Sequence, residues 1–179
     1  MDNKTKGMVM AAMVVLSLVL GLLAVLGSSW LTASEDGMEA NYSLSEAEVD
    51  MGAFGTVVVE FGEGCDESSD NEELCDLATA GTIGTIGLWV GIVMAGLFAA
   101  MIILPMAGID AMNGIPTIVQ KLVSLGAGGM MLLGAIGWLL IKPELEDGMG
   151  LGMSFFMAII AGVLGLAASV MGMLVKADE

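Results

Sequence analysis

The sequence IGLWVGIVMAGLFAAMIILPM occupies residues 86–106 and contains no charged side chain. At about 1.5 Å per residue, a helix of this length crosses the hydrocarbon core of a bilayer, which is about 30 Å thick. A surface helix of a soluble domain would carry charged residues along one face, and this stretch has none on any face. The stretch therefore predicts a membrane-spanning helix, which Pro105 and Gly108 would end.

Three more uncharged runs of comparable length accompany this one in a chain of 179 residues. The chain is 56% hydrophobic and only 15% charged, with a mean hydropathy of +0.88, unlike an ordinary soluble domain. We therefore expect one membrane domain over residues 1–179, an all-α bundle of four transmembrane helices. The expected helices cover residues 8–30, 80–106, 117–141 and 149–175.

The five lysines of the chain predict its orientation in the membrane. Only Lys142 falls on one side of the expected bilayer, whereas four fall on the other: Lys4, Lys6, Lys121 and Lys176. The positive-inside rule then places both termini in the cytoplasm, in a multi-pass protein of the cell membrane. A cleaved secretory signal is the alternative for the first run, although its apolar part is longer than a typical signal core.

The three tryptophans fit the same orientation. Trp30 ends the first expected span, Trp89 lies early in the second and Trp138 lies late in the third. Indole rings are enriched at the interfaces between membrane and water. We therefore expect all three to act as anchors at the outer interface.

The segment over residues 31–76 would then be external and strongly acidic. It carries 14 of the 21 acidic residues and no lysine. One interpretation is a solvated surface, or an adaptation to a salty medium. The other is a field that gathers cations or a basic partner, within a Debye length of about 8 Å. The sequence leaves both open.

The external segment also predicts a small extracytosolic antiparallel β-sheet between the first two spans. Residues 54–61 are rich in β-branched and aromatic side chains and run into a glycine turn, which indicates a strand. A second extended piece is expected over residues 38–44. Between the two, Ser45 and Glu48 predict a single capped helical turn.

Cys65 and Cys75 are the only cysteines, and both lie on the expected oxidising side. We expect a disulfide between them, and the alternative of two free thiols requires a reducing exterior. On the same segment, Asn41 begins an Asn-Tyr-Ser sequence and is a candidate glycosylation site.

Five carboxylates lie between the two cysteines, and hard cations such as calcium bind carboxylate oxygens. The spacing does not match an EF-hand loop, so a solvated charge run is the favoured interpretation and no cofactor is expected. The weak cation candidates are Asp66, Glu67, Asp70, Glu72 and Glu73.

Small residues recur every four positions in two of the expected spans, which lets helices approach closely. Such a face serves as an interface with another protein or copy, or as internal packing of one bundle, and the sequence leaves both open. The interface candidates are Gly87, Gly91, Ala95 and Ala99 in the second span and Ala161, Gly165 and Ser169 in the fourth.

Catalysis and coupled transport are not expected. The chain has no histidine and no arginine, and the apolar runs contain no ionisable residue of the kind that marks proton relays and substrate sites. No cationic patch is present that would neutralise phosphates, so nucleic acid is excluded as a partner. The expected partners are the lipid bilayer and other membrane proteins or copies of this chain.

Trp30 just after the first span, followed by the pair Cys65 and Cys75, resembles the claudin-like tetraspan superfamily of claudins, peripheral myelin protein and calcium-channel gamma subunits. The resemblance implies four spans, cytoplasmic termini and a first external loop folded as a small sheet with a disulfide. A non-catalytic structural, accessory or adhesion-type protein is therefore expected, acting through its outer sheet and small-residue helix faces. The alternative is a component of a cation-selective pore, or a cation-binding subunit of a channel or transporter.

Overall fold

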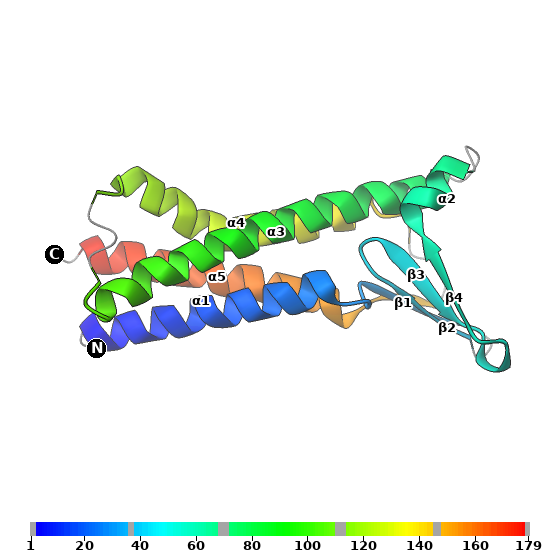
Figure 1. Ribbon diagram of the computed structural model, residues 1–179, viewed down its shortest axis with the longest axis horizontal. Coiled ribbons are helices and arrows are strands. Elements are labelled where there is room, and N and C mark those ends of the chain that lie inside the picture. Colours follow the sequence, from blue (N-terminus) through cyan, green and yellow to red (C-terminus); the bar gives the residue numbers. More distant parts are fainter. Residues whose placement is uncertain (1–2, 36–37, 68–71, 110–113, 145–147, 178–179) are drawn as a thin grey trace.

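The computed structural model describes residues 3–35, 38–67, 72–109, 114–144 and 148–177 (Figure 1). Four long helices run side by side, and a small sheet lies at one end of them. Helix α1 begins and helix α5 ends at the opposite end. We call these two ends the sheet end and the terminal end.

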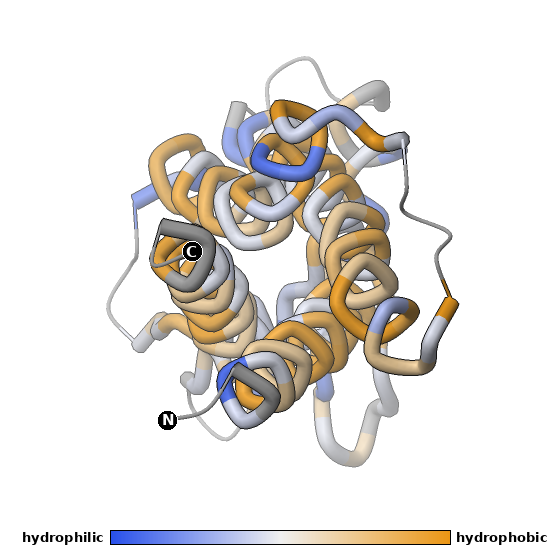
Figure 2. The backbone as a smooth tube through the Cα atoms, turned by 90° about the vertical axis from the view of Figure 1, so that its left-hand side faces the viewer, coloured by the Kyte–Doolittle hydropathy of each residue, from blue (hydrophilic) through white to orange (hydrophobic). Residues whose placement is uncertain are grey.

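The prediction of four long apolar helices is confirmed. Each of them is long and apolar enough to cross a membrane, and in the end-on view of Figure 2 their backbones are coloured mostly as hydrophobic. The helices are α1 (Asn3–Leu26), α3 (Glu72–Met106), α4 (Thr117–Ile141) and α5 (Met153–Ala177).

The helix ends differ from the expected ranges in five places, and α4 coincides with residues 117–141. The smallest difference is at the end of α5, which extends two residues past 175. Helix α1 begins five residues early and ends four residues early, just before Gly27, where a Cβ would collide with the Ser154 side chain. Helix α3 begins eight residues early, extending past the apolar run toward the sheet. Helix α5 begins late, because residues 149–151 pair as a strand.

The predicted antiparallel sheet is also confirmed, with five strands in the order β4-β3-β2-β1-β5. Four of the strands lie between α1 and α3, and the short β5 comes from the connection between α4 and α5. The sequence did not predict β1, β3 or β5. The strands are β1 (Leu31–Glu35), β2 (Met38–Tyr42), β3 (Glu46–Asp50), β4 (Thr56–Glu60) and β5 (Met149–Leu151).

The helical turn expected from Ser45 and Glu48 is wrong, because both residues belong to a hairpin between β2 and β3. The hydroxyl of Ser43 accepts the backbone N–H of Ser45 and of Glu46, which closes a tight turn without a helix. From Ala47 onward, the backbone pairs with both β2 and β4. Pairing on both sides therefore outweighs the local capping signal.

The strand expected over residues 54–61 is shorter than predicted. A 3-10 turn, η1 (Gly52–Phe54), precedes it, and Gly55 has a φ of 88°, which favours glycine. At the other end the chain turns into helix α2 (Phe61–Glu67), whose first side chain is buried. Phe61 stacks on Tyr42 of β2, with ring centroids 6.5 Å apart, so the buried ring holds the first residue of α2 against the sheet.

Candidate functional site

Strand β4 is the most exposed apolar element of the sheet. All five of its residues are exposed, and the exposed fractions of Val57, Val58 and Val59 are 42%, 55% and 38%. In a strand, successive side chains point to opposite faces, so these valines leave apolar surface on both faces of the edge. The sequence marked this stretch as a strand but did not indicate that neither face would be covered.

Strand β4 also lies at an edge of the sheet. It pairs with β3 on one side, with Val58 opposite Glu48 and Val57 opposite Val49. No strand of the described residues pairs with its other side. It contains no proline and no lysine, the residues that commonly block such an edge. An unpaired hydrophobic edge can accept a strand from another chain.

The surface around this edge is negatively charged. The cross-strand pair of Glu46 and Glu60 places two like charges opposite each other, and Glu48 and Asp50 are exposed on β3. The described strands contain no lysine or arginine. A cationic partner is therefore attracted to this edge, whereas an acidic partner binds only where salt screens the repulsion.

An aromatic cluster joins the sheet to the bundle. The Trp30 ring lies edge-on to Trp138, with centroids 5.0 Å apart, and Phe155 lies 6.1 Å from Trp30 and 5.6 Å from Trp138. The indole N–H of Trp30 donates to the carbonyl of Ala24 at 2.8 Å. The sheet is thus held on a packed aromatic layer at the sheet end.

The burial of this layer corrects the expectation that Trp30 and Trp138 are interfacial anchors. Their exposed fractions are 0% and 1%, so their rings contact protein and cannot reach lipid headgroups. Trp89 differs from them, because it is 44% exposed on the side of α3. Its role as an anchor stays a prediction.

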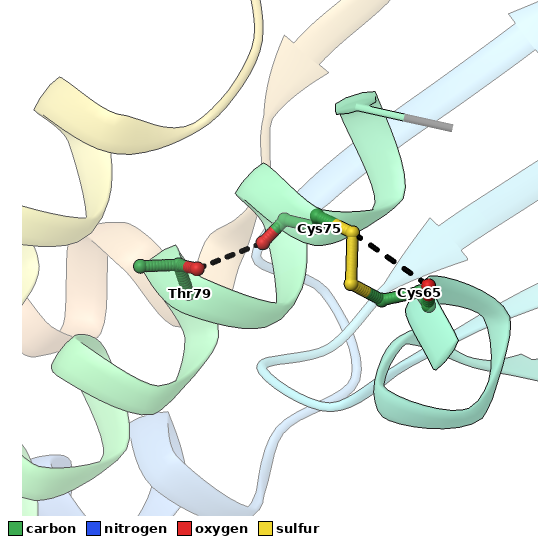
Figure 3. Close-up of a disulfide and its surroundings, with 3 residues drawn as sticks. All are labelled: Cys65, Cys75 and Thr79. Carbon is green, nitrogen blue, oxygen red and sulfur yellow. Dashed lines mark hydrogen bonds between the residues drawn. A yellow bond between two sulfur atoms is a disulfide. The ribbon is translucent and has the colours of Figure 1, made fainter. Parts of the chain in front are cut away.

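The predicted disulfide is confirmed, since the Sγ atoms of Cys65 and Cys75 are bonded at 1.98 Å (Figure 3). The bond links α2, directly after β4, to the first turns of α3. The hydroxyl of Thr79 donates to the Cys75 carbonyl at 2.8 Å. The edge strand is therefore followed by a covalent connection to a long helix.

Leu44 provides a second contact between the sheet and α3. A Cβ on Gly81 would collide with the Leu44 carbonyl, so glycine is required for this close approach. The hairpin between β2 and β3 thus rests on α3 backbone to backbone.

The acidic residues between the cysteines do not form a cation site in the described part of the chain. Asp66 and Glu67 lie in α2, Glu72 and Glu73 begin α3, and Asp70 lies outside the described residues. No group of three possible ligands occurs among the residues that were placed. The favoured interpretation as a solvated charge run, and the weaker one as a cation site, both stay predictions.

Asn41 lies in β2, opposite Thr32 on β1 and Glu48 on β3. It is half-buried and lines a shallow groove over β1, β2 and β5. Its glycosylation stays a prediction.

The small-residue faces of α3 and α5 lie inside the bundle, which agrees with the alternative of internal packing rather than with an interface to another molecule. Gly87 packs on Gly134 of α4, and Gly165 packs on Gly128 of the same helix. The remaining members of both faces are also buried within the chain: Gly91, Ala95, Ala99, Ala161 and Ser169. Neither face is therefore available to a partner.

Buried serines add polar contacts within this packing. The hydroxyl of Ser17 donates to the Ala161 carbonyl at 2.6 Å, and Ser169 donates to Ser124 at 3.1 Å. The first contact joins α1 to α5, and the second joins α5 to α4. These serines therefore bind helices together.

No protein-family model matches the chain, and no curated protein matches it significantly. The proposal below therefore rests on the edge strand, the charge distribution and the helix lengths.

Proposed function

We propose that this chain is a non-catalytic integral membrane protein that binds a partner in the membrane through the free edge of β4. The partner that we propose is a second copy of the same chain. The single observation that carries the proposal is the unpaired strand β4 with its three exposed valines. Such an edge binds by adding a strand to the sheet. This gives a structural, accessory or adhesion-type role to the outer sheet.

Helix length and charge support the proposed placement in the cell membrane. Four helices are long enough to span it, and the lysines near the terminal end favour a cytoplasmic location for that end. The acidic sheet is then external. Proteolysis of sealed cells should cleave the 31–76 segment and spare both termini, and cleavage of the termini would contradict the orientation.

Two copies of β4 fit together as an antiparallel pair. A two-fold axis through Val58 places Val58 opposite its own copy, Val57 opposite Val59, and Thr56 opposite Glu60. No carboxylate then faces another carboxylate across the new pair. The many acidic groups nearby still repel, so association should strengthen as salt is raised.

Substitutions at the edge test this register. Val58→Lys places two lysines opposite each other and should weaken self-association about tenfold. The matched control is Met38→Lys, because Met38 is similarly exposed in the same sheet but away from the β4 edge. The oligomeric mass would be measured in mild detergent at low and high salt.

A rescue variant distinguishes pairing in the proposed register from non-specific apolar association. Val57→Lys combined with Val59→Glu brings opposite charges together twice across the two-fold axis, so the dimer should persist at low salt. These new attractions should weaken as salt is raised, whereas the wild-type dimer should strengthen. A wild-type chain that stays monomeric at every salt concentration would contradict self-association. So would a dimer that survives Val58→Lys.

The acidic surface favours one other function, a cation-gathering component of a pore. Glu39, Glu48 and Asp50 are exposed on the sheet, where they raise the local cation concentration. Reconstituted vesicles should then conduct cations, and neutralising these three residues should reduce the flux. Flux equal to that of protein-free vesicles would exclude this function.

A further inference from the structure

A cavity of about 580 Å³ opens between the helices at the terminal end of the bundle. All four long helices line it, with Gly7 from α1, Pro105 from α3, Lys121 from α4 and Gly172 from α5 among the lining residues. Its volume lies within the range of about 300–1,000 Å³ for small-molecule sites. It is far from the sheet and takes no part in the proposed function of β4.

The cavity exists because α3 and α4 pack tightly at one end and separate at the other. Near the sheet end, Gly87 and Gly134 bring the two backbones into contact. At the terminal end, the last turn of α3 and the first turn of α4 lie apart (Figure 1). Larger side chains, including Phe98 and Ile102, line the resulting space.

The walls of the cavity are apolar and adaptable. Four methionines contribute to them, and their flexible thioether chains can follow the shape of a bound chain. An apolar space of this size loses dispersion contacts if it stays empty. The methionines are Met10, Met101, Met106 and Met173.

Most of the polar groups that line the cavity belong to α4, and Ser169 comes from α5. Ser124 donates to the Lys121 carbonyl at 3.0 Å and accepts from Ser169, so both hydroxyls are already hydrogen-bonded. Gln120 donates to the Ile115 carbonyl at 3.1 Å. Lys121 is exposed, and among the described residues that line the cavity it is the charged one.

We propose that this cavity binds one acyl chain of an anionic phospholipid, with the Lys121 ammonium contacting its phosphate. An apolar chamber with a single cationic group at its edge complements a molecule with a long apolar chain and a negative head. The lining contains no described carboxylate that would repel that head. Lys6, next to the lining residue Gly7, adds a second positive charge near the same end.

This inference rests on the proposed insertion of the chain in a membrane, which the test measures first. The protein and its variants are reconstituted into vesicles of equal parts phosphatidylglycerol and phosphatidylcholine. Flotation with the vesicles shows insertion. The inserted protein is then extracted gently, and native mass spectrometry counts the phospholipids retained by each chain. A chain that does not float contradicts the membrane proposal, independently of the lipid result.

The variants distinguish the contribution of the apolar cavity to lipid binding from the contribution of the Lys121 charge. Gly7→Leu should remove retained phospholipid, because a Cβ at Gly7 has only the Met106 sulfur near it, at 3.8 Å, so the leucine can extend into the cavity. Lys121→Gln should lower the preference for phosphatidylglycerol over phosphatidylcholine about fivefold. Gly172→Leu replaces the first variant if that one does not fold, because its Cβ would lie 3.5 Å from the Met10 sulfur.

Matched controls carry the same substitutions elsewhere. Gly129→Leu lies in α4 where a Cβ would meet nothing within 4 Å, and Lys142→Gln lies at the sheet end. Both should retain lipid as the wild type does, with one phosphatidylglycerol per chain. The proposal is overturned if the wild type retains no phospholipid or only free fatty acid. It is also overturned if both lipids are retained equally, or if folded Gly7→Leu retains as much as its control.

Discussion

The bundle and the sheet differ in how much of their contact surface is covered within the chain. In the bundle, Gly128 of α4 lies directly against the backbone of Gly162 and Gly165 on α5. At the edge of the sheet, Val58 is 55% exposed and has no strand beyond it in the described chain. The small-residue faces of the helices are thus packed against one another within the chain, whereas the sheet leaves an edge that another molecule can pair with. Changes in the bundle should therefore affect folding, and changes at the edge should affect association.

The largest effect is expected at Gly128. A leucine there would collide with the backbone of Gly162 and Leu166, which cannot move aside as a side chain can. Gly128→Leu should cost more than about 3 kcal/mol and prevent α4 and α5 from packing. Thermal unfolding in detergent measures this.

The neighbouring variant Gly129→Leu is its control, because a Cβ at Gly129 meets nothing within 4 Å. Leucine has a higher helix propensity than glycine, so neither variant should lose stability on that account. Equal destabilisation by the two variants would contradict close packing at Gly128 as the cause.

Trp30→Ala should have the next largest effect, because it removes a fully buried ring and the indole hydrogen bond to Ala24. Loss of such a side chain costs about 3–5 kcal/mol. Hydrogen exchange should increase across the sheet while the middle of the helices stays protected. Trp89→Ala, which truncates an exposed ring, should leave exchange in the sheet unchanged. Equal exchange in the two variants would contradict the role of the aromatic cluster as the junction.

Loss of the disulfide should have a smaller effect, confined to the sheet end. Replacing Cys65 and Cys75 by serine opens a loop whose closure is worth about 3 kcal/mol in the chain-entropy model. Limited proteolysis should then cleave near α2 and leave the helices intact. Treating the wild type with reductant should reproduce the pattern, and cleavage within the helices would show that the bond stabilises the bundle as well.

The smallest effect is expected at Glu60, which lies opposite Glu46. Glu60→Gln removes one of two like charges and should stabilise the sheet by about 0.2–1 kcal/mol at low salt, and by less at high salt. Glu48→Gln is the control, because its cross-strand neighbour is Val58. A gain that does not change with salt would contradict an electrostatic cause.

Hydropathy predicted the bundle because each helix is encoded by its own contiguous residues. The sheet was predicted only where its strands are local, as in β2 and β4. Strand β5 is three residues long, and its pairing of Leu151 with Leu31 joins residues far apart in the chain, so no local pattern reveals it. Strand β1 was also missed, although it pairs with the neighbouring β2, because Leu31–Glu35 contains a single β-branched residue and so carries little strand signal.

The candidate site was predicted in part. The spacing of Cys65 and Cys75 led to the disulfide, and the run of valines led to a strand. The burial of a side chain was harder to predict than a strand or a disulfide. A tryptophan at the end of a span has the same sequence context whether it faces lipid or protein. Trp30 and Trp138 therefore match the sequence pattern of anchors, although in the fold both rings pack against Phe155 of α5.

The pairing of β1 with β5 also sets the order in which the chain can be completed during synthesis. Leu31 leaves the ribosome about 120 residues before its partner Leu151, a delay of roughly ten seconds at ordinary translation speeds. Throughout that interval, the side of β1 that will receive β5 has no strand to pair with. The nascent chain therefore presents two open edges, and it closes one of them only after α4 has been made. A chain that stops before residue 149 keeps both.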